Sequence, residues 1–146
     1  MFRWDRVQAM VSKWTSFWLT YRRILIQDII HIRRPDMQAI DSVMHVTPNR
    51  TETVCALAMF YNPSLFEQTA RFQLPLYYTG EAEAVRLEWG NMTGNGSTMA
   101  ATAQQQLQVV SLARDYSVSI NVTLGPREIN YLVIHRGHSD GKDLRT

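Results

Sequence analysis

The sequence predicts a mainly β protein, in which an antiparallel β-sandwich of about seven to eight strands follows one long N-terminal amphipathic α-helix. Two observations carry this prediction. Over residues 4–30, apolar side chains recur at spacings of three and four, which is the period of a helix. After Asp36, short segments either alternate between apolar and polar residues or are continuously apolar, and turn residues separate them with no helical segment between.

We expect the helix to cover residues 4–30, because no proline or glycine interrupts this stretch. It should end before Pro35, since the residue preceding a proline is pushed away from the helical region. The spacing places one apolar stripe on a single face: Trp4, Val7, Val11, Trp14, Trp18, Tyr21 and Leu25. A helix cannot bury such a stripe alone, so we expect Trp4, Trp14, Trp18 and Tyr21 to contact either the sandwich or another domain.

The strand candidates follow in order, at residues 42–47, 53–61, 68–74, 85–89, 107–112, 116–124 and 129–136. Residues 53–61 are apolar on both faces, which predicts a central buried strand. Asn62-Pro63 and Gly125-Pro126 are turn sequences, whereas residues 90–102 are rich in small residues and indicate a loop. Residues 138–146 form a polar tail that we expect to be flexible.

The charge distribution is uneven although the net charge is only +2. Seven of the basic residues and two of the acidic ones lie in residues 1–34, which gives this quarter +5 and the remainder −3. A basic helix can contact nucleic acid or a membrane surface, but a solvated basic face is the favoured interpretation. We therefore expect no nucleic-acid partner and regard membrane contact as unfavoured; no apolar run is long enough to span a bilayer.

Asparagine placement indicates a secretory product. Four of the six asparagines begin an Asn-X-Ser/Thr sequence and are candidates for N-glycosylation: Asn49, Asn91, Asn95 and Asn121. The alternatives are chance in a threonine-rich sequence or a bacterial source. Residues 1–18 interleave charges with aromatic rings and do not resemble a signal peptide. A secreted protein with this sequence would then be the C-terminal part of a longer chain.

Four segments together resemble the C-terminal region of α-galactosidase-like glycoside hydrolases: residues 21–36 (YRRILIQDIIHIRRPD), His45-Val46, residues 57–63 (LAMFYNP) and residues 74–80 (LPLYYTG). The resemblance covers roughly residues 15–135. It implies that residues 1–35 are the last helix of a catalytic (β/α)₈ barrel and a linker, that residues 36–137 are a C-terminal β-sandwich, and that residues 138–146 are a tail. The two catalytic carboxylates of such enzymes would lie in the barrel, upstream of this chain.

No catalytic residue, metal site or cofactor site is predicted. We interpret Glu81 and Glu83 as a solvated rim, and His45 and His135 as structural histidines without metal-ligand spacing. The lone cysteine, Cys55, lies in an apolar segment and should be a buried thiol. Candidate carbohydrate-binding residues are aromatic: Tyr77, Tyr78 and Trp89, with one of the two tyrosines facing outward if the strand alternates. Core packing is the competing role for these rings.

The sequence therefore favours a non-catalytic C-terminal β-sandwich that stabilises a catalytic barrel and contributes to binding of a carbohydrate substrate. Its expected partners are the catalytic barrel of the same protein and carbohydrate. The alternative is a stand-alone secreted module that binds carbohydrate or protein. A module that uses the basic helix to contact a membrane surface or a partner is a third, weaker hypothesis.

Overall fold

The computed structural model describes residues 4–92 and 107–137 and contains one long helix, one short 3₁₀ helix and eight strands. The loop predicted for residues 90–102 begins too early, because Gly90 and Asn91 belong to a strand. Residues 93–102 of that prediction, Asn95 among them, and the tail 138–146 lie outside the described residues. The elements are α1 (Trp4–Leu25), β1 (Asp28–His31), β2 (Asp41–Val46), β3 (Val54–Tyr61), β4 (Gln68–Pro75), η1 (Tyr77–Thr79), β5 (Ala84–Asn91), β6 (Gln108–Ser111), β7 (Ser117–Leu124) and β8 (Ile129–Arg136).

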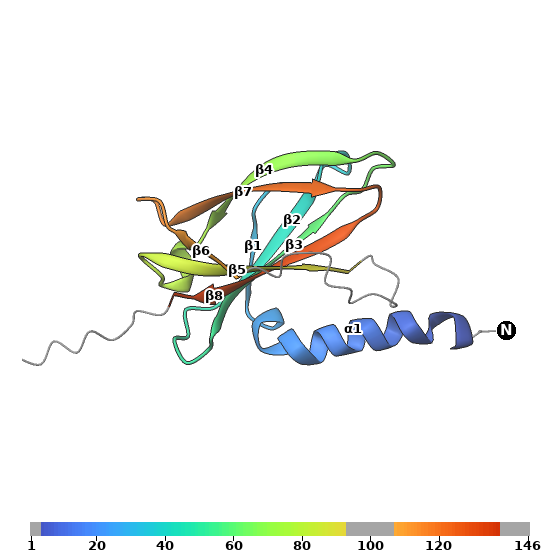
Figure 1. Ribbon diagram of the computed structural model, residues 1–146, viewed down its shortest axis with the longest axis horizontal. Coiled ribbons are helices and arrows are strands. Elements are labelled where there is room, and N and C mark those ends of the chain that lie inside the picture. The colour runs from blue at the N-terminus through green and yellow to red at the C-terminus, as the bar shows by residue number, and fades with distance from the viewer. Residues whose placement is uncertain (1–3, 93–106, 138–146) are drawn as a thin grey trace, which may run out of the picture.

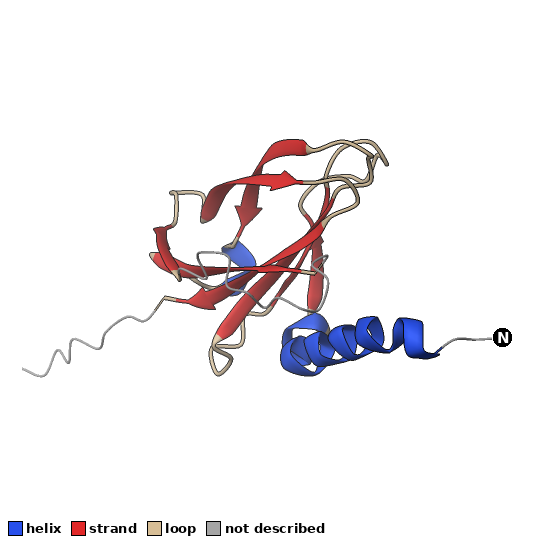
Figure 2. Ribbon diagram, turned by 45° about the vertical axis from the view of Figure 1, so that its right-hand side comes forward, coloured by secondary structure: helices blue, strands red, loops and turns tan. Residues whose placement is uncertain are grey.

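The strands form two antiparallel sheets, which confirms the predicted mainly β fold. The larger sheet has the order β1-β2-β3-β8-β5-β6, and the smaller one pairs β4 with β7. The smaller sheet lies over one face of the larger sheet, and α1 lies on the opposite side (Figure 1). A view turned by 45° shows the same order of layers, with α1 outside the two sheets (Figure 2).

The main core fills the space between the two sheets. Alternate residues of β4 and β7, such as Phe72, Leu74 and Val122, are buried there, while their neighbours along each strand face outward. On the larger sheet, Phe60 and Leu132 are fully buried in the same core. The alternation seen in the sequence thus corresponds to one buried face and one solvated face of the β4–β7 sheet.

Strand β3 has both faces covered, as its continuous apolar sequence predicts. It pairs with β2 on one side and β8 on the other. Ala58 and Phe60 contribute to the core between the sheets, whereas Leu57 belongs to a second apolar cluster beneath α1. The second cluster explains why a sandwich strand carries apolar residues on both faces.

The helix is shorter than the sequence pattern predicts, because α1 ends at Leu25 and residues 28–31 form the edge strand β1. Strand β1 pairs with β2, with Ile30 opposite Met44. Ile30 packs against the main core. Consecutive isoleucines favour an extended strand, and pairing with β2 satisfies the backbone while burying Ile30. The strand pairing therefore outweighs continuation of the helix.

The helix attaches to the sheet through its C-terminal half. Phe17 and Ile24 are buried against Leu57 of β3 and Val133 of β8. The ring of Phe17 packs edge-on against Tyr131 of β8, with centroids 5.0 Å apart. Burial of these side chains fixes α1 on the outer face of the larger sheet.

Candidate functional site

The aromatic stripe of α1 remains largely outside the cluster that attaches the helix. We define the Trp face as Trp4, Val11, Trp14 and Trp18, whose exposed fractions are 51%, 39%, 37% and 48%. Tyr21, the fourth aromatic member of the predicted stripe, is different, because it packs beneath the helix with its ring 5.8 Å from that of Tyr131. The helix thus has one apolar face on the sheet and a second apolar face toward solvent.

Two of the predicted carbohydrate-binding residues belong to an exposed cluster of aromatic side chains at one end of the sandwich. Tyr77 and Tyr78 are both exposed, at 67% and 57%, and they lie in the 3₁₀ helix η1 and not in a strand. The expected strand alternation, in which only one of them faces outward, is therefore wrong. Tyr116, which the sequence analysis did not single out, lies with its ring 5.8 Å from that of Tyr77. We call Tyr77, Tyr78 and Tyr116 the tyrosine cluster.

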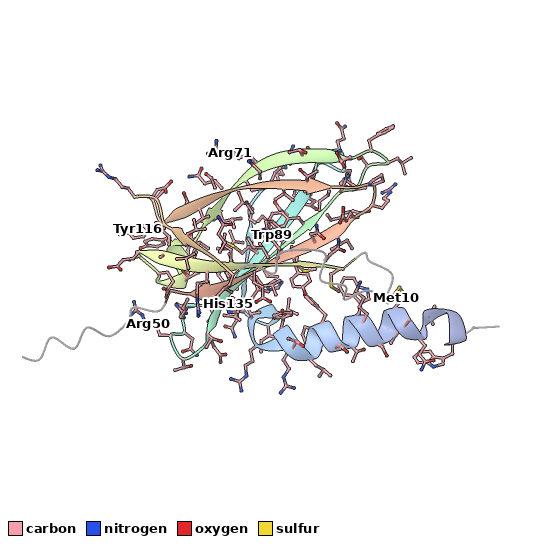
Figure 3. All side chains as sticks on the ribbon, in the orientation of Figure 1. Met10, Arg50, Arg71, Trp89, Tyr116 and His135 are labelled. Atoms are coloured by element: carbon pink, nitrogen blue, oxygen red, sulfur yellow. The ribbon has the colours of Figure 1, made fainter. Side chains whose placement is uncertain are left out.

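The structure does not bring Trp89 into the tyrosine cluster. Its indole packs against the main core, with the ring of Phe60 5.9 Å away. Trp89 lies in the centre of the molecule, whereas Tyr116 lies at one end of it (Figure 3). Trp89 therefore has a core-packing role, which is the competing interpretation of this residue.

A shallow groove of about 480 Å³ lies along β4, beside the residues that flank Tyr116. Ile32, Ala70 and Phe72 supply apolar atoms to its lining. Its polar side chains are Arg33, Arg71, Gln73, Asp115 and Ser117. Pro75, which closely precedes Tyr77 in the chain, also lines the groove, so that the groove and the tyrosine cluster share one end of the sandwich.

The polar groups at this end hold one another in position. The Gln73 amide donates 2.8 Å hydrogen bonds to Asp115 Oδ2 and to Ser117 Oγ. Ser117 Oγ in turn donates to Asp115 Oδ1 at 2.7 Å. This bond to Ser117 is the main cause that lowers the pKa of Asp115, which is a solvated carboxylate. Asp115 is therefore an ordered, ionised acceptor at the protein surface.

Glu81 is not a solvated rim residue, and that prediction is wrong. Its carboxylate pairs with Arg136, with 2.6 Å between Oε1 and Nη1 and with the Glu81 side chain only 14% exposed. Arg136 also donates to four backbone carbonyls, which belong to Thr47, Asn49, Glu52 and Thr79. A buried arginine can satisfy all five of its N–H groups in this way. Arg136 thereby ties the loop between β2 and β3 to η1 and to the end of β8.

The histidines have structural surroundings. His135 Nε2 lies 2.8 Å from Glu88 Oε2, in the layer between the sheet and α1. Burial lowers the pKa of His45, which favours its neutral form. Over residues 4–92 and 107–137, no three His, Cys, Asp or Glu side chains are grouped as a metal ion would require. Cys55 is buried, which confirms its predicted environment.

Three of the four glycosylation candidates are described. Asn121 is exposed on the outer face of β7, and Asn49 is exposed in the loop after β2. The Asn49 side chain accepts hydrogen bonds from the backbone N–H and the hydroxyl of Thr51. The Asn91 amide nitrogen, by contrast, donates to Glu128 at 2.7 Å. Two sites are therefore open, and at the third the nitrogen that a glycan would join is engaged.

The fold and its surfaces define a class: a two-layer antiparallel β-sandwich with a helix on its outer face. No protein-family model matches the sequence, and no curated protein matches it. Among solved structures, one similar chain is that of a Bacillus halodurans protein to which an α-N-acetylgalactosaminidase activity is ascribed. The identity is 17% and the TM-score is 0.44, over 75% of this chain and 20% of that one. This chain thus spans a fifth of that structure, and membership of the α-galactosidase-like family stays a prediction.

Proposed function

We propose that this chain is a non-catalytic β-sandwich domain of a larger glycoside hydrolase-like protein, and that the Trp face of α1 packs against the catalytic domain of that protein. The observation that carries the proposal is the Trp face itself, because its four members are exposed while Phe17 and Ile24 already attach the helix to the sheet. Contiguous exposed aromatic residues mark surfaces that another surface covers.

A catalytic domain is the partner for two reasons. The four residues of the Trp face are apolar and suit a folded protein surface better than a charged ligand, although the exposed Arg22 projects at the same angle of the helix as Trp4. The sequence that continues from α1 into β2 and β3 resembles the region where a hydrolase barrel meets its sandwich. No helix in the described part of the chain has the length and hydropathy needed to cross a bilayer.

The test uses the polypeptide that contains both this chain and the catalytic domain. Changing Trp14 and Trp18 together to aspartate should lower the thermal unfolding temperature of the catalytic domain and its glycosidase activity. The matched control is Leu19→Asp, because Leu19 is 59% exposed on a different side of the same helix. Equal effects of the control and the double change would contradict the proposed interface.

Two further measurements address the alternatives. Light scattering on the 146-residue chain alone should report a monomer; a dimer that the double tryptophan change dissociates would show that a second copy covers the Trp face. Turnover of α-glycosides by the isolated chain, abolished by changing one of its own carboxylates, would overturn the non-catalytic role.

We also propose that the protein is secreted and carries N-linked glycans at Asn49 and Asn121. Both asparagines are exposed and lie in the required sequence, whereas the Asn91 amide is engaged by Glu128. Protein expressed through the secretory pathway of eukaryotic cells should lose mass on treatment with peptide N-glycosidase, and Asn49→Gln and Asn121→Gln should each remove one glycan. Unchanged mass after the enzyme treatment would contradict this proposal.

A further inference from the structure

We propose that the tyrosine cluster and the adjacent polar groups of β4 and β7 form a binding site for a neutral oligosaccharide. The site is distinct from the Trp face, because it lies at the end of the sandwich where β4 leads into η1 and where β7 begins. The choice of carbohydrate as ligand class rests on the proposed function, whereas the existence of a site rests on the geometry that follows.

The three rings form a corner rather than a flat surface. Tyr77 is the central ring, with Tyr78 5.6 Å away at an interplanar angle of 85° and Tyr116 5.8 Å away at 64°. All three remain exposed, by 67%, 57% and 41% respectively. A pyranose ring presents apolar C–H groups on its faces and hydroxyls around its edge. Such a corner lets one tyrosine contact the apolar face of the sugar while a neighbouring ring contacts its edge.

The polar groups beside the cluster match the edge of a sugar. Asp115 is an ionised acceptor with lone pairs beyond those that Gln73 and Ser117 occupy, and sugar hydroxyls are donors. The side-chain carbonyl of the exposed Gln73 extends this set along the groove of about 480 Å³. The groove itself is lined mainly by polar side chains, with Arg33 and Arg71 as further donors, and the tyrosine cluster adjoins one end of it.

The backbone at Tyr116 determines the position of its ring. Tyr116 has a φ of 59°, in the left-handed region that a bulky residue rarely adopts. The conformation closes a tight turn, because Tyr116 N–H donates to Ala113 O and Ala113 N–H donates to Ser117 O. Glycine would adopt this conformation without strain, and Tyr116 shares it with two other non-glycine residues, Met37 and Arg127. Its ring contact with Tyr77 shows where that side chain is directed.

The test titrates the ¹⁵N-labelled 146-residue chain with four probes: cellohexaose, maltohexaose, mannohexaose and a galactomannan oligosaccharide. We expect at least one probe to shift the amide resonances of residues 73–78 and 115–117 selectively. Tyr77→Ala should weaken that binding about tenfold or more, as expected for a central contact residue. Tyr116→Gly should weaken it as well while preserving the fold, because glycine suits the backbone of the turn. The control is Phe66→Ala, an aromatic residue 76% exposed on a different loop.

Absence of a selective shift with every probe at about 10 mM, a concentration at which even millimolar binding is visible, would overturn the proposed site. Equal weakening of binding by Phe66→Ala would also overturn it. So would binding of a proline-rich peptide at the tyrosine cluster without any oligosaccharide binding. Failure here is separable from failure of the proposed domain role. The paired tryptophan change should leave oligosaccharide binding intact, and the tyrosine changes should leave the catalytic domain unaffected.

Discussion

Replacing Arg136 with methionine should be among the most damaging single changes to the fold. Arg136 is 9% exposed and makes five side-chain hydrogen bonds of 2.6 to 3.0 Å, one to the Glu81 carboxylate and four to backbone carbonyls. Methionine fills a similar volume but has no donor. The change therefore leaves a partly buried carboxylate without its partner and removes one hydrogen bond from each of four carbonyls, of which the Asn49 carbonyl keeps a bond from the Glu52 N–H.

Removing one member of a buried ion pair costs about 3 to 5 kcal/mol. The Glu81 side chain is 14% exposed, so water can solvate part of the carboxylate, and we expect a loss of about 3 kcal/mol in the free energy of unfolding. With a urea m-value of about 2 kcal/mol/M, the unfolding midpoint should fall by about 1.5 M. Urea titration of the isolated chain, followed by circular dichroism, measures this shift.

Two further variants separate the ion pair from the carbonyl contacts. Arg136→Lys keeps the charge near Glu81 but has three donors on one nitrogen, so it should recover only part of the loss. Adding Glu81→Gln to the methionine variant removes the unpaired charge and should restore some stability. Arg114→Met, at an exposed position, should change stability by less than about 0.5 kcal/mol. A loss below about 1 kcal/mol in Arg136→Met would refute this account, since water would then replace the arginine at little cost.

Four other outcomes follow from the buried layer beneath α1 and from the core. Phe17→Ala should cost about 3 kcal/mol in urea unfolding, because the ring is 9% exposed and packs on Tyr131. Gly90→Ala should cost about 1 to 3 kcal/mol by the same assay, since an added Cβ overlaps the Tyr131 ring. Burial raises the pKa of Cys55 to about 12, so a thiol reagent should label it only in urea. Burial also raises the pKa of Tyr21 and of Tyr131, because it favours the neutral phenol. The neutral tyrosines therefore contribute fully to the free energy of unfolding below a pH of about 10, and this contribution should be lost as the pH rises further. Urea unfolding at a series of alkaline pH values measures the loss.

The sequence predicts the sandwich well because its signal is local. Alternation in β4 and β7, and the double-sided apolar sequence of β3, reflect which faces are buried. The end of α1 is predicted wrongly because residues 26–30 continue the apolar content of the helix, and only pairing with the distant strand β2 decides that they form a strand. A local pattern contains no information about such a partner.

The candidate sites show the same limit. From the sequence, we expect one of Tyr77 and Tyr78 to face outward, as alternate residues of a strand do. That expectation is wrong because the chain forms η1 there. Tyr116 is distant from Tyr77 in sequence, and the local sequence does not predict the left-handed backbone conformation of Tyr116. In the sequence, Arg136 is an ordinary charged residue at the end of a predicted strand, and Glu81 is an ordinary charged residue after a turn. The burial of Arg136 depends on three carbonyls of the loop after β2 and one of η1, which converge only in the folded chain.

The position of Phe17 clarifies what the aromatic stripe of α1 means. On a helical projection with 100° per residue, Phe17 and Ile24 lie about 100° to 160° around the helix from Trp4, Val11 and Trp18. Trp14 lies between the two groups, and its ring packs edge-on against Phe17 with centroids 6.0 Å apart. The sheet covers the side with Phe17 and Ile24, so most of the stripe that the spacing rule selects is exposed, although Tyr21 and Leu25 at its end pack beneath the helix. A helix that needed only the sandwich would have its longest aromatic series on the sheet. The three tryptophans on the exposed side are the reason that we assign the proposed domain role to the Trp face.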